Sequence, residues 1–157
     1  MKPTKFSNLL IAAAGVAVVG FFAIQQIVGN GLPAPTAGLN IVLIQPALAI
    51  ILALSAIPMI RYRSGLKKLE EDKGPRPTPV DSIYALRTLA LAKAVSLTGS
   101  IFVGWNLAIL TYQLLSPQQP KLLMTILGIL GALIMVVVGL IIENLFRIPP
   151  DKDADAA

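Results

Sequence analysis

The stretch that decides the fold runs from Thr78 to Leu115 and reads TPVDSIYALRTLALAKAVSLTGSIFVGWNLAILTYQLL. It is the longest apolar stretch of the chain, and two basic residues, Arg87 and Lys93, are embedded in its helical pattern. A segment this long and this apolar is typical of a helix that crosses a membrane. We therefore expect the other segments of the chain to belong to a membrane protein as well.

Three more apolar blocks accompany this stretch. Hydrophobic residues make up 55 % of the 157 residues and charged residues 13 %, about half the share in soluble proteins. Each block reaches about 20 residues, enough to cross a core of about 30 Å as a helix, and none shows the alternation of barrel strands. The sequence predicts an all-α polytopic membrane protein with four transmembrane helices in an antiparallel bundle. The expected bounds are 8–28, 39–60, 79–115 and 121–146, with a cytoplasmic loop at 61–78 and a disordered tail at 150–157, all in one membrane domain.

The charges predict the orientation. With the N-terminus in the cytoplasm, every Lys and Arg except Lys121 lies on the cytoplasmic side, as the positive-inside rule requires. We therefore expect both termini in the cytoplasm and a multi-pass protein of the inner, or plasma, membrane. The acidic residues fall on the same side, so the net charge of +5 reflects topology, and nucleic acid is not an expected partner.

Catalytic signatures are missing from the sequence. It contains no Cys and no His, which excludes disulfides, thiolate chemistry, histidine-ligated haem and ordinary zinc sites. No nucleophile–base pair and no phosphate-binding loop is visible, so we expect no enzyme activity, no cofactor and no metal. The apolar run that follows the basic N-terminus is longer than a typical signal core, and no clear A-x-A cleavage site appears between its end and Gly38, which favours a retained membrane anchor over a signal peptide.

The predicted third helix contains a ladder of small residues spaced four apart. Its members are Thr88, Ala92, Ser96, Ser100, Gly104 and Ala108. This spacing favours a close helix crossing, as in small-xxx-small motifs. Two interpretations stay open: packing against the first or fourth helix of the same chain, or docking of a membrane-protein partner or a second copy.

Lys93 and Glu143 are predicted to lie at the same depth. Lys93 lies about 33 Å before Leu115 along one helix, and Glu143 lies about 32 Å after Leu122 along the next. An ion pair or shared polar cluster is expected, with Arg87 and Arg147 closer to the cytoplasm. The alternatives are that Lys93 extends to the headgroups while Glu143 sits in water, or that both take part in transport or proton relay.

Other polar residues fall into two groups. Four basic residues follow the second helix directly and are candidates for contact with anionic lipid headgroups, or else simple topology determinants: Arg61, Arg63, Lys67 and Lys68. Five amides fall in the outer half of the membrane and are candidates for a small polar cavity: Gln25, Gln26, Gln45, Asn106 and Gln113. Pro46 predicts a kink next to Gln45.

Short motifs resemble a known family. MKPTK at residues 1–5, PVD at 79–81, ALRTLALAKA at 85–94 and ENLFRIPP at 143–150 are similar to an actinobacterial family of small four-span membrane proteins. That family is a domain of unknown function, commonly encoded beside folate-biosynthesis genes. The resemblance implies signature positions at Met1 to Thr4, Arg87, Ala92 to Ala94, Glu143, Arg147 and Pro149. It implies no activity, and the gene neighbourhood hints at folate or pantothenate metabolism.

The expected function is that of a non-catalytic accessory or scaffolding subunit of an inner-membrane assembly, with the third helix as the docking helix. The alternative is a small transporter or channel component that acts as an oligomer. A transporter needs a continuous polar path, and the almost wholly apolar fourth helix offers little to a single copy.

Overall fold

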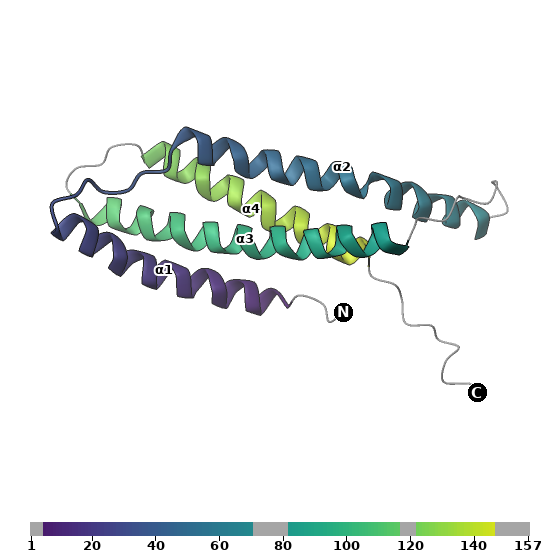
Figure 1. Cartoon of the computed structure of the whole chain (residues 1–157), viewed down its shortest axis with the longest axis horizontal. Helices are drawn as coiled ribbons and strands as arrows, with labels where there is room; N and C mark the ends of the chain where they lie inside the picture. Colours follow the sequence, from purple (N-terminus) through teal and green to yellow (C-terminus); the bar gives the residue numbers. More distant parts are fainter. Residues whose placement is uncertain (1–4, 71–81, 117–121, 147–157) are drawn as a thin grey trace, which may run out of the picture.

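Four long helices make up the fold. The computed structural model describes residues 5–70, 82–116 and 122–146. Its helices are α1 (Phe6–Gly29), α2 (Leu39–Glu70), α3 (Ser82–Leu115) and α4 (Leu122–Leu145), and these ranges contain no strand (Figure 1). Each helix is long and apolar enough to cross a membrane. The prediction of an all-α, four-span membrane protein is confirmed.

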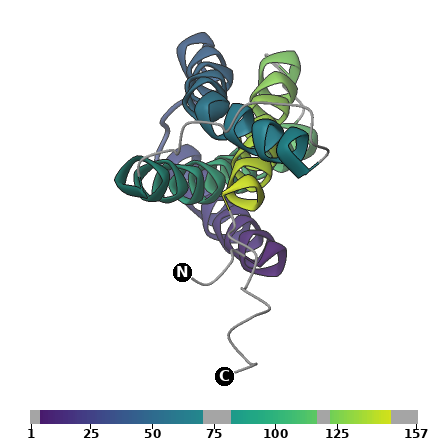
Figure 2. The same cartoon turned by 90° about the vertical axis from the view of Figure 1, so that its right-hand side faces the viewer.

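The helices are arranged around a central pair. α3 and α4 pack along their length as antiparallel neighbours, α1 packs against α3, and α2 packs mainly against α4. Figures 1 and 2 show α1 and α2 on opposite sides of the α3–α4 pair. Within the described residues α1 packs closely on neither α2 nor α4. Successive helices run in opposite directions, so α1 is parallel to α3.

α2 contacts the bundle through a narrow seam. Its buried positions recur at alternating steps of three and four: Val42, Gln45, Ala49, Leu52 and Ala56. The large side chains between them, such as Leu43 and Ile50, are more than half exposed. This spacing places the buried residues on one stripe of the helix. In a membrane the other faces contact lipid and stay apolar, so hydrophobicity alone does not mark the stripe.

The end of α2 corrects one prediction. The helix was expected to stop at Ile60 and give way to a loop at 61–78, but it continues to Glu70. The apolar run marks the edge of the membrane, and the following Lys, Leu and Glu residues favour helix without being apolar. The remaining loop, the expected start of α3 at Pro79, the start of α4 at 121 and the tail at 150–157 lie outside the described residues.

Both prolines of α2 lie inside the continuous helix. Proline removes one backbone hydrogen bond from the helix and weakens it locally. In the turn before Pro58, the Tyr84 hydroxyl of α3 donates a hydrogen bond to the Ser55 carbonyl, at 2.7 Å. This bond ties the weakened turn of α2 to the start of α3.

Candidate functional site

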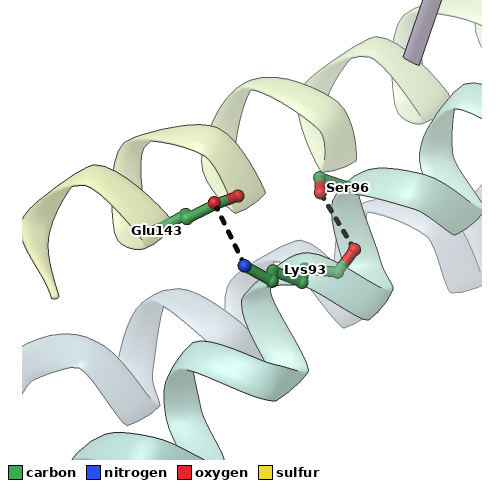
Figure 3. A network of polar contacts seen from close by, with 3 residues as sticks. All are labelled: Lys93, Ser96 and Glu143. Atoms are coloured by element: carbon green, nitrogen blue, oxygen red, sulfur yellow. Dashed lines mark hydrogen bonds and ion pairs between the residues drawn. The ribbon is translucent and has the colours of Figure 1, made fainter. Parts of the chain in front are cut away.

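Lys93 and Glu143 lie together between α3 and α4. The Lys93 Nζ is 3.8 Å from the Glu143 Oε1, and the exposed fractions of the two side chains are 25 % and 8 % (Figure 3). The antiparallel α3–α4 pair places the two residues at the same level, as expected from their distances to the outer turn. Glu143 is therefore buried in the bundle and not surrounded by bulk water.

The neighbouring lysine offsets part of the cost of burying the carboxylate. A charged group loses its hydration when it is buried, and an opposite charge must offset that cost. The nearby Ser96 hydroxyl donates to the Lys93 carbonyl at 3.0 Å, so it serves the backbone of α3. Arg87, two turns closer to the start of α3, is exposed.

The small-residue ladder is buried inside the chain. All six members are buried: Thr88, Ala92, Ser96, Ser100, Gly104 and Ala108. A Cβ atom at Gly104 would overlap the backbone carbonyl of Ala13 in α1, and a Cβ at Gly139 of α4 would lie 2.8 Å from the Ser96 Cβ. The ladder therefore packs against α1 and α4 of the same chain. Of the two interpretations left open by the sequence, this packing within the chain is the first.

The hydroxyl groups of the ladder are satisfied by α3 itself. Thr88 donates to the Tyr84 carbonyl at 3.0 Å, and Ser100 donates to the Leu97 carbonyl at 2.7 Å. Such local bonds let Ser and Thr side chains lie in an apolar helix interface without a partner on another helix. The ladder thus acts as a smooth packing surface rather than as a set of binding groups.

Three of the five outer-half amides are buried between α2, α3 and α4. They are Gln45, Asn106 and Gln113, whereas Gln25 and Gln26 are exposed on α1 and do not join them. The Asn106 Nδ2 donates to the Phe102 carbonyl at 2.8 Å. The expected cluster is therefore smaller than predicted, because α1 turns its two glutamines away from the other helices.

Thr125 of α4 belongs to the same group and was missed from the sequence. Its hydroxyl donates to the Gln113 Oε1 at 3.0 Å and is fully buried. The sequence did contain a signal for it: Thr125 is the one hydroxyl residue of α4. It lies near the start of that helix, as Gln113 lies near the end of α3. Matching the two positions across the α3–α4 hairpin would have paired them.

Gln45 is the polar residue that the fold satisfies least. It is 1 % exposed, and neither its Nε2 nor its Oε1 has a hydrogen-bond partner. A Cβ atom at Gly131 of α4 would lie 2.7 Å from the Gln45 Oε1, so α4 reaches the amide only because position 131 is glycine. Burial of an unbonded polar atom costs stability.

Replacement of Gln45 by methionine is expected to stabilise the protein by about 1 kcal/mol or more, because a side chain of similar length removes two unbonded polar atoms. The measurement is the midpoint of unfolding by sodium dodecyl sulfate in mixed micelles. Gln113→Met is the matched control and should lower the midpoint, since it removes the acceptor of the Thr125 hydroxyl. A lower midpoint for Gln45→Met would contradict the prediction.

An apolar layer separates the amides from the ion pair. Leu52 of α2 and Met135 of α4 are fully buried and belong to one hydrophobic cluster. Met135 lies between Gly131, which contacts Gln45, and Glu143 along the same helix. The polar groups of α2 and α4 are thus divided into two sets with closely packed apolar side chains between them. In the predicted orientation the set at Gln45 is the outer set and the set at Glu143 is the inner set.

The basic cluster lies on the helical extension of α2. Arg61 is exposed, and the backbone at Arg63, Lys67 and Lys68 is helical; the side chains of these last three lie outside the described set. The four residues therefore lie along a continuous helix, and their contact with anionic headgroups stays a prediction. Among the described residues, no three His, Cys, Asp or Glu side chains lie close enough to hold a metal ion.

Comparison with known families gives one match. A family model described as "Protein of unknown function (DUF3180)" matches residues 9–150. The chain belongs to the DUF3180 family. The matched range of this DUF3180 protein includes most of α1 and all of α2, α3 and α4, together with Lys93 and Glu143. No curated protein and no solved structure matches the chain.

Proposed function

We propose that this DUF3180 protein is a non-catalytic accessory or scaffolding subunit of an assembly in the inner, or plasma, membrane. In this proposal both termini lie in the cytoplasm, where the positive-inside rule places them. The resemblance to an actinobacterial family encoded beside folate-biosynthesis genes is compatible with such a role, and the proposal does not depend on it.

One observation carries the proposal: apart from Gln45, the polar groups named above inside the bundle serve its own packing. The ladder hydroxyls bond to α3, Gln113 bonds to Thr125, and Lys93 lies beside Glu143. Leu52 and Met135 separate the outer polar set from the inner one. A solute crossing a single copy would have to pass this apolar layer. The surface left for function is the lipid-facing one, which suits association with another membrane helix.

Because the α3 ladder is occupied, the docking surface is proposed to lie on α1. Ala14 and Gly15 are exposed, and no atom lies within 4 Å of a Cβ built at Gly15. Small residues allow another helix to approach the backbone closely. The exposed face of α2 carries large side chains such as Leu43 and Ile50, which hold a neighbour farther away.

The alternative is a transporter or channel component that acts as an oligomer. The buried, unbonded amide of Gln45 and the charged pair at Lys93 and Glu143 favour it, because polar groups within a membrane often mark a transport pathway. A pathway formed between copies would avoid the Leu52–Met135 layer. The experiment below separates the two proposals.

The test is purification from the native membrane into lipid nanodiscs, followed by mass determination and identification of co-purifying proteins. A foreign protein in a fixed ratio is the expected result. Gly15→Leu should release it, and Ala53→Leu, a change at an exposed position of α2, should not. An oligomer of this chain alone would overturn the accessory role and favour the transporter.

A further inference from the structure

An open apolar groove lies between α1, α3 and α4, on the side of the bundle away from α2. Its volume is about 160 Å³. The lining residues come from the first two turns of α1 and from the middle of the other two helices: Phe6, Leu9, Leu10, Ala13, Ser100, Val103, Leu133 and Val136. The groove exists because α1 packs on α3 and does not approach α4 closely within the described residues.

The chemistry of the groove selects an apolar occupant. Its one polar side chain, Ser100, donates its hydroxyl to the Leu97 carbonyl and leaves no donor for a ligand. An apolar cavity of about 150 Å³ holds a molecule the size of benzene without water. The groove has room for a hydrocarbon segment of that size, and Phe6 and Leu10 are more than half exposed along its open side.

A positive region adjoins the groove at the start of α1. Lys5 is exposed and occupies the N-cap position next to Phe6, and among the described residues no side chain caps this helix end. A helix N-terminus carries partial positive charge, and basic residues near a membrane surface attract anionic lipids. α1 begins part-way along α3 (Figure 1). Phe6, the residue after Lys5, lines the groove, so this positive end adjoins it.

We propose that the groove binds an anionic phospholipid, with a segment of one acyl chain between α1, α3 and α4 and the phosphate at Lys5 and the N-terminus of α1. The combination of an apolar groove with a cationic mouth matches an amphiphile with an anionic head. This site goes beyond the accessory role and is separate from the basic cluster of α2, which includes Arg61.

The test uses the full chain in vesicles of equal parts phosphatidylcholine and phosphatidylglycerol. After extraction in mild detergent, native mass spectrometry counts the lipids that stay bound. The wild type is expected to retain phosphatidylglycerol. Leu133→Trp should lose it because the indole fills the groove, and Ile134→Trp, on the adjacent exposed position outside the groove, should keep it.

The headgroup contact is tested by charge removal. Lys5→Gln is expected to lower phosphatidylglycerol retention about fivefold, the equivalent of about 1 kcal/mol per basic residue near the surface. Arg61→Gln is the control and should change it little. The proposal is overturned if the wild type retains no lipid, if it retains phosphatidylcholine equally, or if the two tryptophan variants retain the same amount.

Discussion

Replacement of Gly104 by leucine is expected to separate α1 from α3 and to lower the free energy of unfolding by about 3 kcal/mol, the upper end of the usual range for an overpacked interface. The reason is geometric: a Cβ at this position would overlap the backbone carbonyl of Ala13, and backbone cannot move aside as a flexible side chain can. α1 has no other close helix neighbour within the described residues, so the loss should be specific to α1.

The native tryptophan makes this loss measurable. Trp105 is the single tryptophan of the chain, and its ring lies 3.2 Å from a Cβ built at Gly20 of α1. Trp105 emission should therefore report the detachment of α1 during a dodecyl sulfate titration, while circular dichroism reports the helices. In Gly104→Leu the emission should change at a lower detergent fraction than in the wild type, ahead of any loss of helix.

Gly15→Leu is the matched control on α1. No atom lies within 4 Å of a Cβ at Gly15, and leucine favours a helix over glycine by up to about 1 kcal/mol. This variant should unfold at the wild-type midpoint or above it. If Gly104→Leu unfolds like Gly15→Leu, the close approach of α1 to α3 is wrong.

The second large effect is expected at the charged pair. Lys93→Met should destabilise the protein by about 1–3 kcal/mol, because it removes the opposite charge that lies 3.8 Å from the buried Glu143 carboxylate. Glu143→Gln should cost less, since Lys93 is partly exposed and its ammonium can reach water. The double variant should be more stable than the sum of the single changes predicts.

A double-mutant cycle on unfolding midpoints gives the coupling energy, which is expected to be about 1 kcal/mol or more for residues in contact. Arg87→Met is the control, because Arg87 is an exposed basic residue on the same helix. Its effect should add to that of Glu143→Gln within about 0.5 kcal/mol. Additive effects of the Lys93 and Glu143 substitutions would contradict the expected coupling between these two residues.

The sequence was most informative where helix geometry alone determines position. The four spans follow from block length, and the common level of Lys93 and Glu143 follows from the rise per residue on two antiparallel helices. Neither conclusion needs knowledge of which face of a helix is buried. Both conclusions therefore agree with the structure.

The sequence was least informative about faces and neighbours. Gln25 and Gln45 look alike in sequence, but Gln45 is on the buried stripe of α2 and Gln25 faces outward from α1. Because lipid keeps the outer faces apolar, no hydrophobic pattern separates the two cases. The small-residue ladder could be recognised from the sequence as a packing surface. For the same reason the sequence did not decide whether it packs against α1 and α4 of the same chain or against a partner.

The separation of α1 from α2 has a consequence for biosynthesis. Both helices are synthesised before α3 and α4, yet within the described residues they share no close packing, and α1 packs only on α3. A nascent chain that ends after α2 therefore holds two membrane helices whose described residues do not pack closely on each other in the native fold. The native bundle can form only after α3 and α4 have been synthesised, because the α3–α4 hairpin supplies the surfaces on which α1 and α2 pack. The two later helices thus organise the two earlier ones.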